Sequence, residues 1–155
     1  DTKDYVLRTS RRTFEAAAFL KENKADTVAV RKLFSVSSEM INLKNDILNN
    51  AEIYGNCMIS SSESTSSDIR IITAKAVDEM LNVENVKASF VLSYISNGVV
   101  QISARSLGEE NVQLIMENLG GGGHSTMAAA QIQNADLDTA KNMLLKAIDN
   151  YYLAK

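Results

Sequence analysis

The most constraining feature of this sequence is a pair of segments rich in β-branched and aromatic residues, joined through an Asn-Gly dipeptide. The first segment covers residues 88–95, the second covers residues 99–105, and Asn97 and Gly98 lie between them. Asn-Gly readily adopts the positive φ angles that a tight turn between antiparallel strands requires. The sequence therefore predicts a β-hairpin in the middle of the chain.

Helical and strand periodicities alternate over the rest of the chain. Apolar residues at helical spacing predict helices at 13–22, 26–34 (with Asp26 as N-cap), 40–51, 69–81, 112–119 and 137–151. A two-residue rhythm predicts strands at 51–59 and 129–133, and the serine-rich run 60–67 is interpreted as a solvated loop. Together these elements predict an α/β domain over residues 37–155, preceded by a separate segment over residues 1–36.

Composition and charge restrict the function classes. The 155 residues carry a net charge of −3 with a pI near 5.2, which argues against binding of long nucleic acid through a basic face. A small phosphate-bearing ligand remains open, because one or two arginines and some backbone amides suffice to hold it. The single cysteine, Cys57, cannot form an internal disulfide and fits a reducing, cytosolic setting. No apolar stretch reaches the ~20 residues that a membrane-spanning helix needs.

A glycine run followed by a histidine and two hydroxyl residues is the outstanding local motif. It consists of Gly120, Gly121, Gly122, Gly123, His124, Ser125 and Thr126. Glycines let a backbone approach a ligand closely and can turn its amides towards an anion. The run lacks the Lys-Ser/Thr of a Walker loop and does not follow a strand as a dinucleotide fingerprint would. A helix C-cap followed by a flexible turn is the alternative, and the spacing leaves both readings open.

Arg105 and Ser106 stand where the second strand of the predicted hairpin ends. An arginine at a strand end is well placed to clamp a phosphate, and an exposed surface arginine is the alternative. One predicted helix separates Arg105 from the glycine run, an arrangement in which both could converge on one ligand. Glu109 and Glu110 precede that helix and are interpreted as helix caps and dipole partners rather than metal ligands.

These motifs resemble the DHHA1 domain. The resemblance rests on Ser103-Ala-Arg-Ser106, on Gly120-Gly-Gly-Gly-His124 after an intervening helix, and on the small residues 128–130. It implies an α/β fold with a mixed β-sheet flanked by helices. In that family the Gly-Gly-Gly-His loop and the preceding arginine strand hold the phosphate and nucleotide of the substrate. The resemblance thus implies that Arg105, Ser106 and residues 120–126 bind substrate.

The amino-terminal segment resembles the end of the DHH domain in GdpP-type cyclic-di-AMP phosphodiesterases. The matching elements are Asp1-Thr-Lys3, Arg8-Thr9 and residues 11–17, and the chain starts without a methionine, as part of a longer protein would. In that family the aspartate of the Asp-Thr-Lys element helps to bind two manganese ions, so Asp1 is implied as a metal ligand. The Asp-His-His element and the other ligands are missing from this sequence. The two Mn²⁺ ions are therefore implied for the full-length parent and are not expected to be held by this chain.

The resemblance further implies what the parent does. Residues 1–36 are expected to be a helical remnant of the DHH domain plus a linker, and residues 37–155 the DHHA1 substrate-binding domain. The implied reaction is hydrolysis of cyclic di-AMP to linear pApA, and this chain alone is expected to bind nucleotide without hydrolysing it. The implied partners are a cyclic dinucleotide or short oligonucleotide and the upstream DHH domain, with a homodimer left open. Long nucleic acid and direct membrane contact are not expected, although upstream helices anchor such parents at the cytoplasmic face of the cell membrane.

Two alternatives differ in substrate and in class. One is the DHHA1 part of an oligoribonuclease or RecJ-like nuclease, and the segment 11–17 favours the cyclic-dinucleotide branch over it. The other is a non-enzymatic RNA-binding or assembly module such as the one in alanyl-tRNA synthetases. The acidic charge balance weighs against this second alternative, because an RNA-binding module needs a basic surface.

Overall fold

The structure is a computed structural model that describes residues 2, 5 and 8–155. It divides the chain into two compact units, Asp1–Ser37 and Ser38–Lys155. This division lies one residue beyond the predicted boundary between residues 36 and 37.

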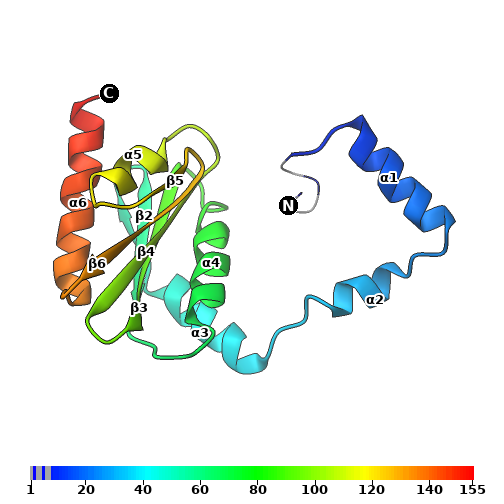
Figure 1. The fold of residues 1–155 in the computed structure, drawn as a ribbon, viewed down its shortest axis with the longest axis horizontal. Helices are drawn as coiled ribbons and strands as arrows, with labels where there is room; N and C mark the ends of the chain where they lie inside the picture. Colours follow the sequence, from blue (N-terminus) through cyan, green and yellow to red (C-terminus); the bar gives the residue numbers. More distant parts are fainter. Residues whose placement is uncertain (1, 3–4, 6–7) are drawn as a thin grey trace. The chain divides into compact units, whose positions relative to one another are not determined.

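The first unit contains two short helices, α1 (Arg11–Glu22) and α2 (Thr27–Lys32) (Figure 1). The side chain of Asp26 accepts hydrogen bonds from the amides of Val28 and Ala29, at 2.9 and 3.1 Å, which confirms it as the N-cap of α2. Neither helix has a buried residue. Their apolar side chains are therefore not part of a hydrophobic core within this unit.

The second unit is built on a six-stranded sheet. Its strands are β1 (Glu52–Tyr54), β2 (Cys57–Ser62), β3 (Ala88–Ser96), β4 (Val99–Ser106), β5 (Gly122–His124) and β6 (Met127–Gln133). Their order in the sheet is β1-β2-β3-β4-β6-β5. Strands β2 and β3 are parallel, and every other neighbouring pair is antiparallel. The predicted mixed sheet is confirmed.

The β3–β4 hairpin has the predicted position, with Asn97 and Gly98 in the turn, but of these two residues only Gly98 has a positive φ. Gly98 has φ +69°, the left-handed conformation that glycine adopts without strain. The strands pair in register from Ala88 opposite Ser106 to Tyr94 opposite Val100, and a β-irregularity follows between Tyr94 and Ser96. This hairpin forms the centre of the sheet.

Two predictions near the start of the sheet were wrong. Residues 51–59 form two antiparallel strands, β1 and β2, rather than one, because Gly55 (φ +58°) and Asn56 make a tight turn between them. The serines expected in a solvated loop begin later, since residues 60–62 continue β2 and Ser60 is buried. The hydroxyl of Ser60 donates to the carbonyl of Ile47 at 2.5 Å, which satisfies its hydrogen-bonding requirement inside the protein.

Helices cover the two faces of the sheet. Figure 1 shows α5 (Val112–Glu117) and α6 (Leu137–Leu153) on one side and α4 (Ile69–Met80) on the other, with α3 (Ser38–Asn49) beside α4. The larger core lies under α5 and α6 and includes Phe90, Ile102 and Leu144. A smaller core joins α3, α4 and Val91 on the opposite face. None of the helices in the described part of the chain is both long enough and apolar enough to cross a bilayer.

Candidate functional site

Arg105 and His124 lie in one row across the sheet. Arg105 pairs with Met127 of β6, and Met127 pairs in turn with His124 of β5. Directly opposite residues of antiparallel strands project from the same face, so the three side chains share one face of the sheet. Two interstrand steps place the Cα atoms of Arg105 and His124 about 10 Å apart. The sheet thus brings together the two groups that the sequence analysis expected to converge.

The Arg105 side chain is held in place rather than free on the surface. Its Nε donates to Oδ1 of Asp78 in α4 at 3.2 Å, and its Nη1 donates to the carbonyl of Ala104 at 2.9 Å. Only 15% of the side chain is exposed, so the alternative of an exposed surface arginine is wrong. A guanidinium carries five N–H donors, and these two bonds leave donors for an incoming anion.

Ser106 does not line the surface on which Arg105 and His124 lie. It is buried and holds the neighbouring backbone in place. Its side chain is buried, its hydroxyl donates to the carbonyl of Glu110 at 2.6 Å, and its amide donates to the carbonyl of Thr126 at 3.0 Å. The same hydroxyl lies 3.4 Å from the carbonyl oxygen of Ser125. Ser106 therefore fixes the turn between β5 and β6 relative to the end of β4.

The first half of the glycine run ends a helix. The amides of Gly120 and Gly121 donate to the carbonyls of Glu117 and Met116, at 3.0 and 2.9 Å, and Gly120 has φ +74°. This is the hydrogen-bonding pattern with which a left-handed glycine closes a helix C-terminus. The helix-cap reading is confirmed for these two residues, and their amides are not available to an anion.

The second half of the run is a strand, not a flexible turn. Gly122 and Gly123 belong to β5, which pairs with β6 at the edge of the sheet. A Cβ on Gly121 would lie 2.2 Å from the carbonyl oxygen of Ala129, and one on Gly123 would lie 2.5 Å from that of Met127. These glycines allow the chain to pack closely against β6.

The end of the glycine motif is open to solvent. His124, Ser125 and Thr126 are all exposed, and the last two make the turn into β6. The carbonyls of Ser125 and Thr126 accept hydrogen bonds from the amides of Val112 and Ser106, at 2.9 and 3.0 Å. The backbone of the turn is thus anchored while its side chains remain accessible.

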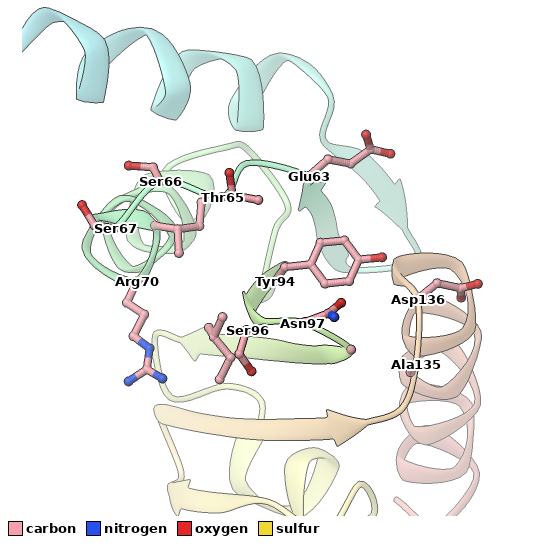
Figure 2. Close-up of a pocket in the computed structure, with 13 residues that line it drawn as sticks. Glu63, Thr65, Ser66, Ser67, Arg70, Tyr94, Ser96, Asn97, Ala135 and Asp136 are labelled. Atoms are coloured by element: carbon pink, nitrogen blue, oxygen red, sulfur yellow. The ribbon is translucent and has the colours of Figure 1, made fainter.

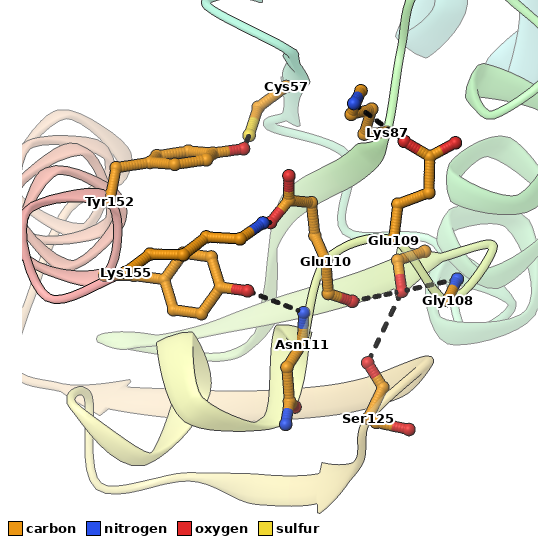
Figure 3. Close-up of polar contacts among 11 residues, drawn as sticks. Cys57, Lys87, Gly108, Glu109, Glu110, Asn111, Ser125, Tyr152 and Lys155 are labelled. Atoms are coloured by element: carbon orange, nitrogen blue, oxygen red, sulfur yellow. Dashed lines mark hydrogen bonds and ion pairs between the residues drawn. The ribbon is translucent and has the colours of Figure 1, made fainter.

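A buried carboxylate lies beneath this end of the sheet. Glu110 is 3% exposed, and its carboxylate accepts a hydrogen bond from Nζ of Lys155 at 2.8 Å (Figure 3). Burial by itself would raise the pKa of Glu110, but hydrogen bonds from Lys155, Tyr151 and Tyr152 outweigh burial and lower that pKa. The expectation that Glu110 caps a helix was wrong, because Asn111 caps α5 by accepting from the amide of Gln113.

The tyrosines of this cluster attach the end of α6 to the site. The hydroxyl of Tyr151 accepts from the amide of Asn111 at 3.0 Å, and that of Tyr152 lies 3.8 Å from Sγ of Cys57 (Figure 3). Burial is the main cause that raises the pKa values of both Cys57 and Tyr152. Both groups are therefore neutral at physiological pH, and they act as packing and hydrogen-bonding groups.

Removing the partner of Glu110 should destabilise the second unit. We expect Lys155→Met to lower the free energy of unfolding at pH 7, because the buried carboxylate of Glu110 loses a charge-assisted hydrogen bond. The folded pKa of Glu110 is lowered, so its stabilisation is present above the unfolded pKa of ~4.3 and is lost as pH falls through the folded pKa. The difference between wild type and variant should therefore shrink below about pH 4.

Urea unfolding at pH 7 and at pH 3.5 provides the measurement. Lys146→Met is the matched control, because Lys146 is an exposed lysine of α6, the helix that ends two residues before Lys155, and it forms no ion pair among the described residues. Equal losses for the two variants at pH 7 would show that the Glu110–Lys155 contact does not stabilise the protein.

A separate pocket lies at the opposite end of the sheet. Its volume is about 870 Å³, and its lining includes Ser66, Arg70, Tyr94, Asn97 and Asp136 (Figure 2). These residues come from the segment leading into α4 and its first turn, from the end of β3 and the β3–β4 turn, and from the segment before α6. None of the substrate-binding residues expected from the sequence lines it.

No metal centre is present in the described part of the chain. Residues 2, 5 and 8–155 contain no group of three or more His, Cys, Asp or Glu side chains arranged to hold a metal ion. Asp1, the metal ligand implied by the family resemblance, lies outside the described residues. The side chains that are described therefore do not fit a two-metal site.

Comparisons with known proteins agree with the fold and motifs. Residues 64–153 match the family described as "DHHA1 domain". The chain is 40% identical over 153 residues to the cyclic-di-AMP phosphodiesterase PdeA of Listeria monocytogenes, covering 98% of this chain and 23% of that protein. It is 42% identical over 154 residues to the cyclic-di-AMP phosphodiesterase GdpP of Geobacillus thermodenitrificans, again covering 98% and 23%. The chain thus spans about a quarter of the length of these relatives.

A solved structure shares the fold. The crystal structure of an exopolyphosphatase-related protein from Bacteroides fragilis matches with a TM-score of 0.84 and 20% identity, covering 97% of this chain and 46% of that protein. At this level of identity the likeness establishes the architecture, and function has to be argued from the site itself.

Proposed function

The chain belongs to the DHHA1 domain family, and on this premise we propose that it is the substrate-binding part of a phosphodiesterase that hydrolyses cyclic di-AMP to linear pApA. The observation that carries the proposal is the identity of 40–42%, over almost the whole chain, with two cyclic-di-AMP phosphodiesterases. The row of Arg105, Met127 and His124 supplies a cationic group and an imidazole on one face, which suits a phosphate diester.

In this proposal Arg105 binds a phosphate of the substrate through charge-assisted hydrogen bonds, and His124 donates a further hydrogen bond to the same phosphate. Asp78 orients the guanidinium, and Ser106 with Glu110 fixes the turn that carries Ser125 and Thr126. A phosphate bound here would be accessible from the open side of the sheet. The chain's own residues thus bind and orient the substrate.

Catalysis in the proposed enzyme requires a part that this chain does not supply. We infer that residues 1–36 are the end of an upstream DHH domain, that this domain holds two divalent metal ions, and that the metal is manganese. Metal ions there would supply an activated water and charge stabilisation at the phosphodiester. We further propose that upstream helices anchor the parent at the cytoplasmic face of the membrane, and that the parent forms a homodimer.

Substrate comparison in the full-length parent tests the proposed function. We expect rapid cleavage of cyclic di-AMP with manganese, slower cleavage of pApA and of longer single strands, and no product from residues 1–155 alone. Product analysis by chromatography distinguishes these substrates. Preferential cleavage of longer strands would support the nuclease alternative, and binding of RNA at physiological salt without cleavage would support the RNA-binding alternative.

A further inference from the structure

The face that carries Arg105 and His124 continues along β6 as a set of accessible side chains. Along β6, Met127, Ala129, Gln131 and Gln133 are exposed, while the alternate residues are buried under α5 and α6. On the Arg105 side of the sheet, α3 and α4 form their core with β2 and β3, through Met58 and Val91. Strands β6 and β5 therefore remain open on this face.

The register of the strands sorts the side chains of this face into four rows, and the fourth, Val99 opposite Gln133, lies farthest from Arg105. The first is the row of Arg105, Met127 and His124 already described. In the second row Ser103 pairs with Ala129, which pairs with Gly122 of β5, and in the third row Gln101 pairs with Gln131. The first and third rows are four residues apart along each strand, or about 13 Å.

The first three rows suit, in order, the phosphate, the sugar and the base of a nucleotide. The first row offers positive charge and an imidazole, which suit a phosphate. The second row carries small side chains, and because Ser103 is buried, a sugar or the flat face of a base can approach this row over Ala129 and Gly122 of β6 and β5. The third row carries two amides, which can hydrogen-bond to the edge of a base. An extended nucleoside phosphate presents phosphate, sugar and base in the same order.

The two amides are not equivalent. Nε2 of Gln101 donates to Oγ of Ser103 at 3.4 Å, which directs it along its own strand. Gln131 is exposed, and its side chain has no hydrogen bond to any residue that the structure describes. Its amide therefore keeps one N–H₂ donor group and one carbonyl acceptor available to a ligand.

We propose that Gln131 recognises an adenine base of the dinucleotide whose phosphate is held by Arg105 and His124. This inference rests on the proposed function. A glutamine amide pairs with adenine through two hydrogen bonds, because adenine presents the N6 donor beside the N7 acceptor. Guanine presents two acceptors, O6 and N7, at the same edge, so the carbonyl of Gln131 would face an acceptor. Gln131 thus discriminates adenine from guanine.

The test compares two cyclic dinucleotides that differ only in their bases. Dissociation constants for cyclic di-AMP and cyclic di-GMP are measured by calorimetry on the full-length parent with divalent metal removed, so that binding is observed without turnover. In Gln131→Ala the preference for cyclic di-AMP is expected to fall about tenfold, the effect of one lost bidentate contact. Gln133→Ala is the matched control, since Gln133 is an exposed glutamine on the same face, one step farther from Arg105.

The outcomes separate this inference from the proposed function. An unchanged preference in Gln131→Ala, with Arg105→Ala weakening both ligands, overturns the base-reading role and leaves the phosphodiesterase proposal standing. If Gln133→Ala loses the preference for cyclic di-AMP over cyclic di-GMP and Gln131→Ala keeps it, the base binds elsewhere. This result also overturns the proposed role of Gln131. A wild-type parent that fails to cleave cyclic di-AMP with manganese overturns the proposed function and the inference together.

Discussion

Replacing Gly123 with alanine is expected to lower the free energy of unfolding of the second unit by about 2–6 kcal/mol. The new Cβ would lie 2.5 Å from the carbonyl oxygen of Met127 and 2.6 Å from Cα of Ala128, both in the backbone of β6. Overpacking of this kind costs about 1–3 kcal/mol. Gly123 also has φ +148°, a conformation that costs a residue with a Cβ about 1–3 kcal/mol more.

Gly122→Ala provides a control one residue away. A Cβ on Gly122 meets no atom within 4 Å, and its φ is not positive, so alanine is expected to change stability by no more than about 0.5 kcal/mol. Urea unfolding monitored by circular dichroism measures both variants. Similar unfolding midpoints for the two would show that β5 does not pack against β6 as the structure has it.

The glycine run shows how far local sequence carries. Four glycines in succession predict positions at which a side chain would clash with its surroundings. The structure shows such a clash for a Cβ added at Gly121 or Gly123. The sequence left open whether the glycines make room for a ligand or end a helix, whereas the structure shows that Gly121 and Gly123 make room for the neighbouring strand. Which glycine faces β6 depends on the register of a sheet edge, and no residue within the run encodes that register.

The same contrast holds for the strands. The Asn97–Gly98 turn was predicted correctly because its dipeptide and the flanking segments are contiguous. The β1–β2 turn at Gly55 and Asn56 carries a comparable Gly-Asn signal, but apolar alternation on both sides led to the prediction of one long strand. Ser60 was assigned to a loop because its burial depends on an acceptor, the carbonyl of Ile47 in α3, that lies outside its own segment.

Only part of the site could be predicted from the sequence. Arg105 and His124 were expected to converge, and the pairing of β6 with both β4 and β5 places them in one row. The cluster around Glu110 was missed, because Lys155 lies 45 residues away and only the packing of α6 brings it to the carboxylate. Gln131 was missed as well, since its proposed role follows from strand register rather than from a motif.

Removing the Arg105 side chain is expected to weaken binding of cyclic di-AMP to the parent by about 10- to 150-fold. A charge-assisted hydrogen bond to an anion contributes about 1.5–3 kcal/mol, and 1.4 kcal/mol corresponds to tenfold in affinity. Arg105→Lys should recover only part of the loss, because lysine keeps the charge but lacks the planar set of donors that Asp78 orients. Calorimetric titration without divalent metal measures these affinities.

Arg70→Ala is the control that makes the Arg105 result specific. Arg70 is an exposed arginine near the start of α4, whereas Asp78, the partner of Arg105, is near the end of that helix. Arg70 lines the pocket at the opposite end of the sheet. If cyclic di-AMP binds in the row of Arg105, Met127 and His124, Arg70→Ala leaves the dissociation constant unchanged. A large loss in Arg70→Ala with none in Arg105→Ala would instead move the nucleotide to the pocket, and the assignment of Arg105 to the phosphate would be wrong.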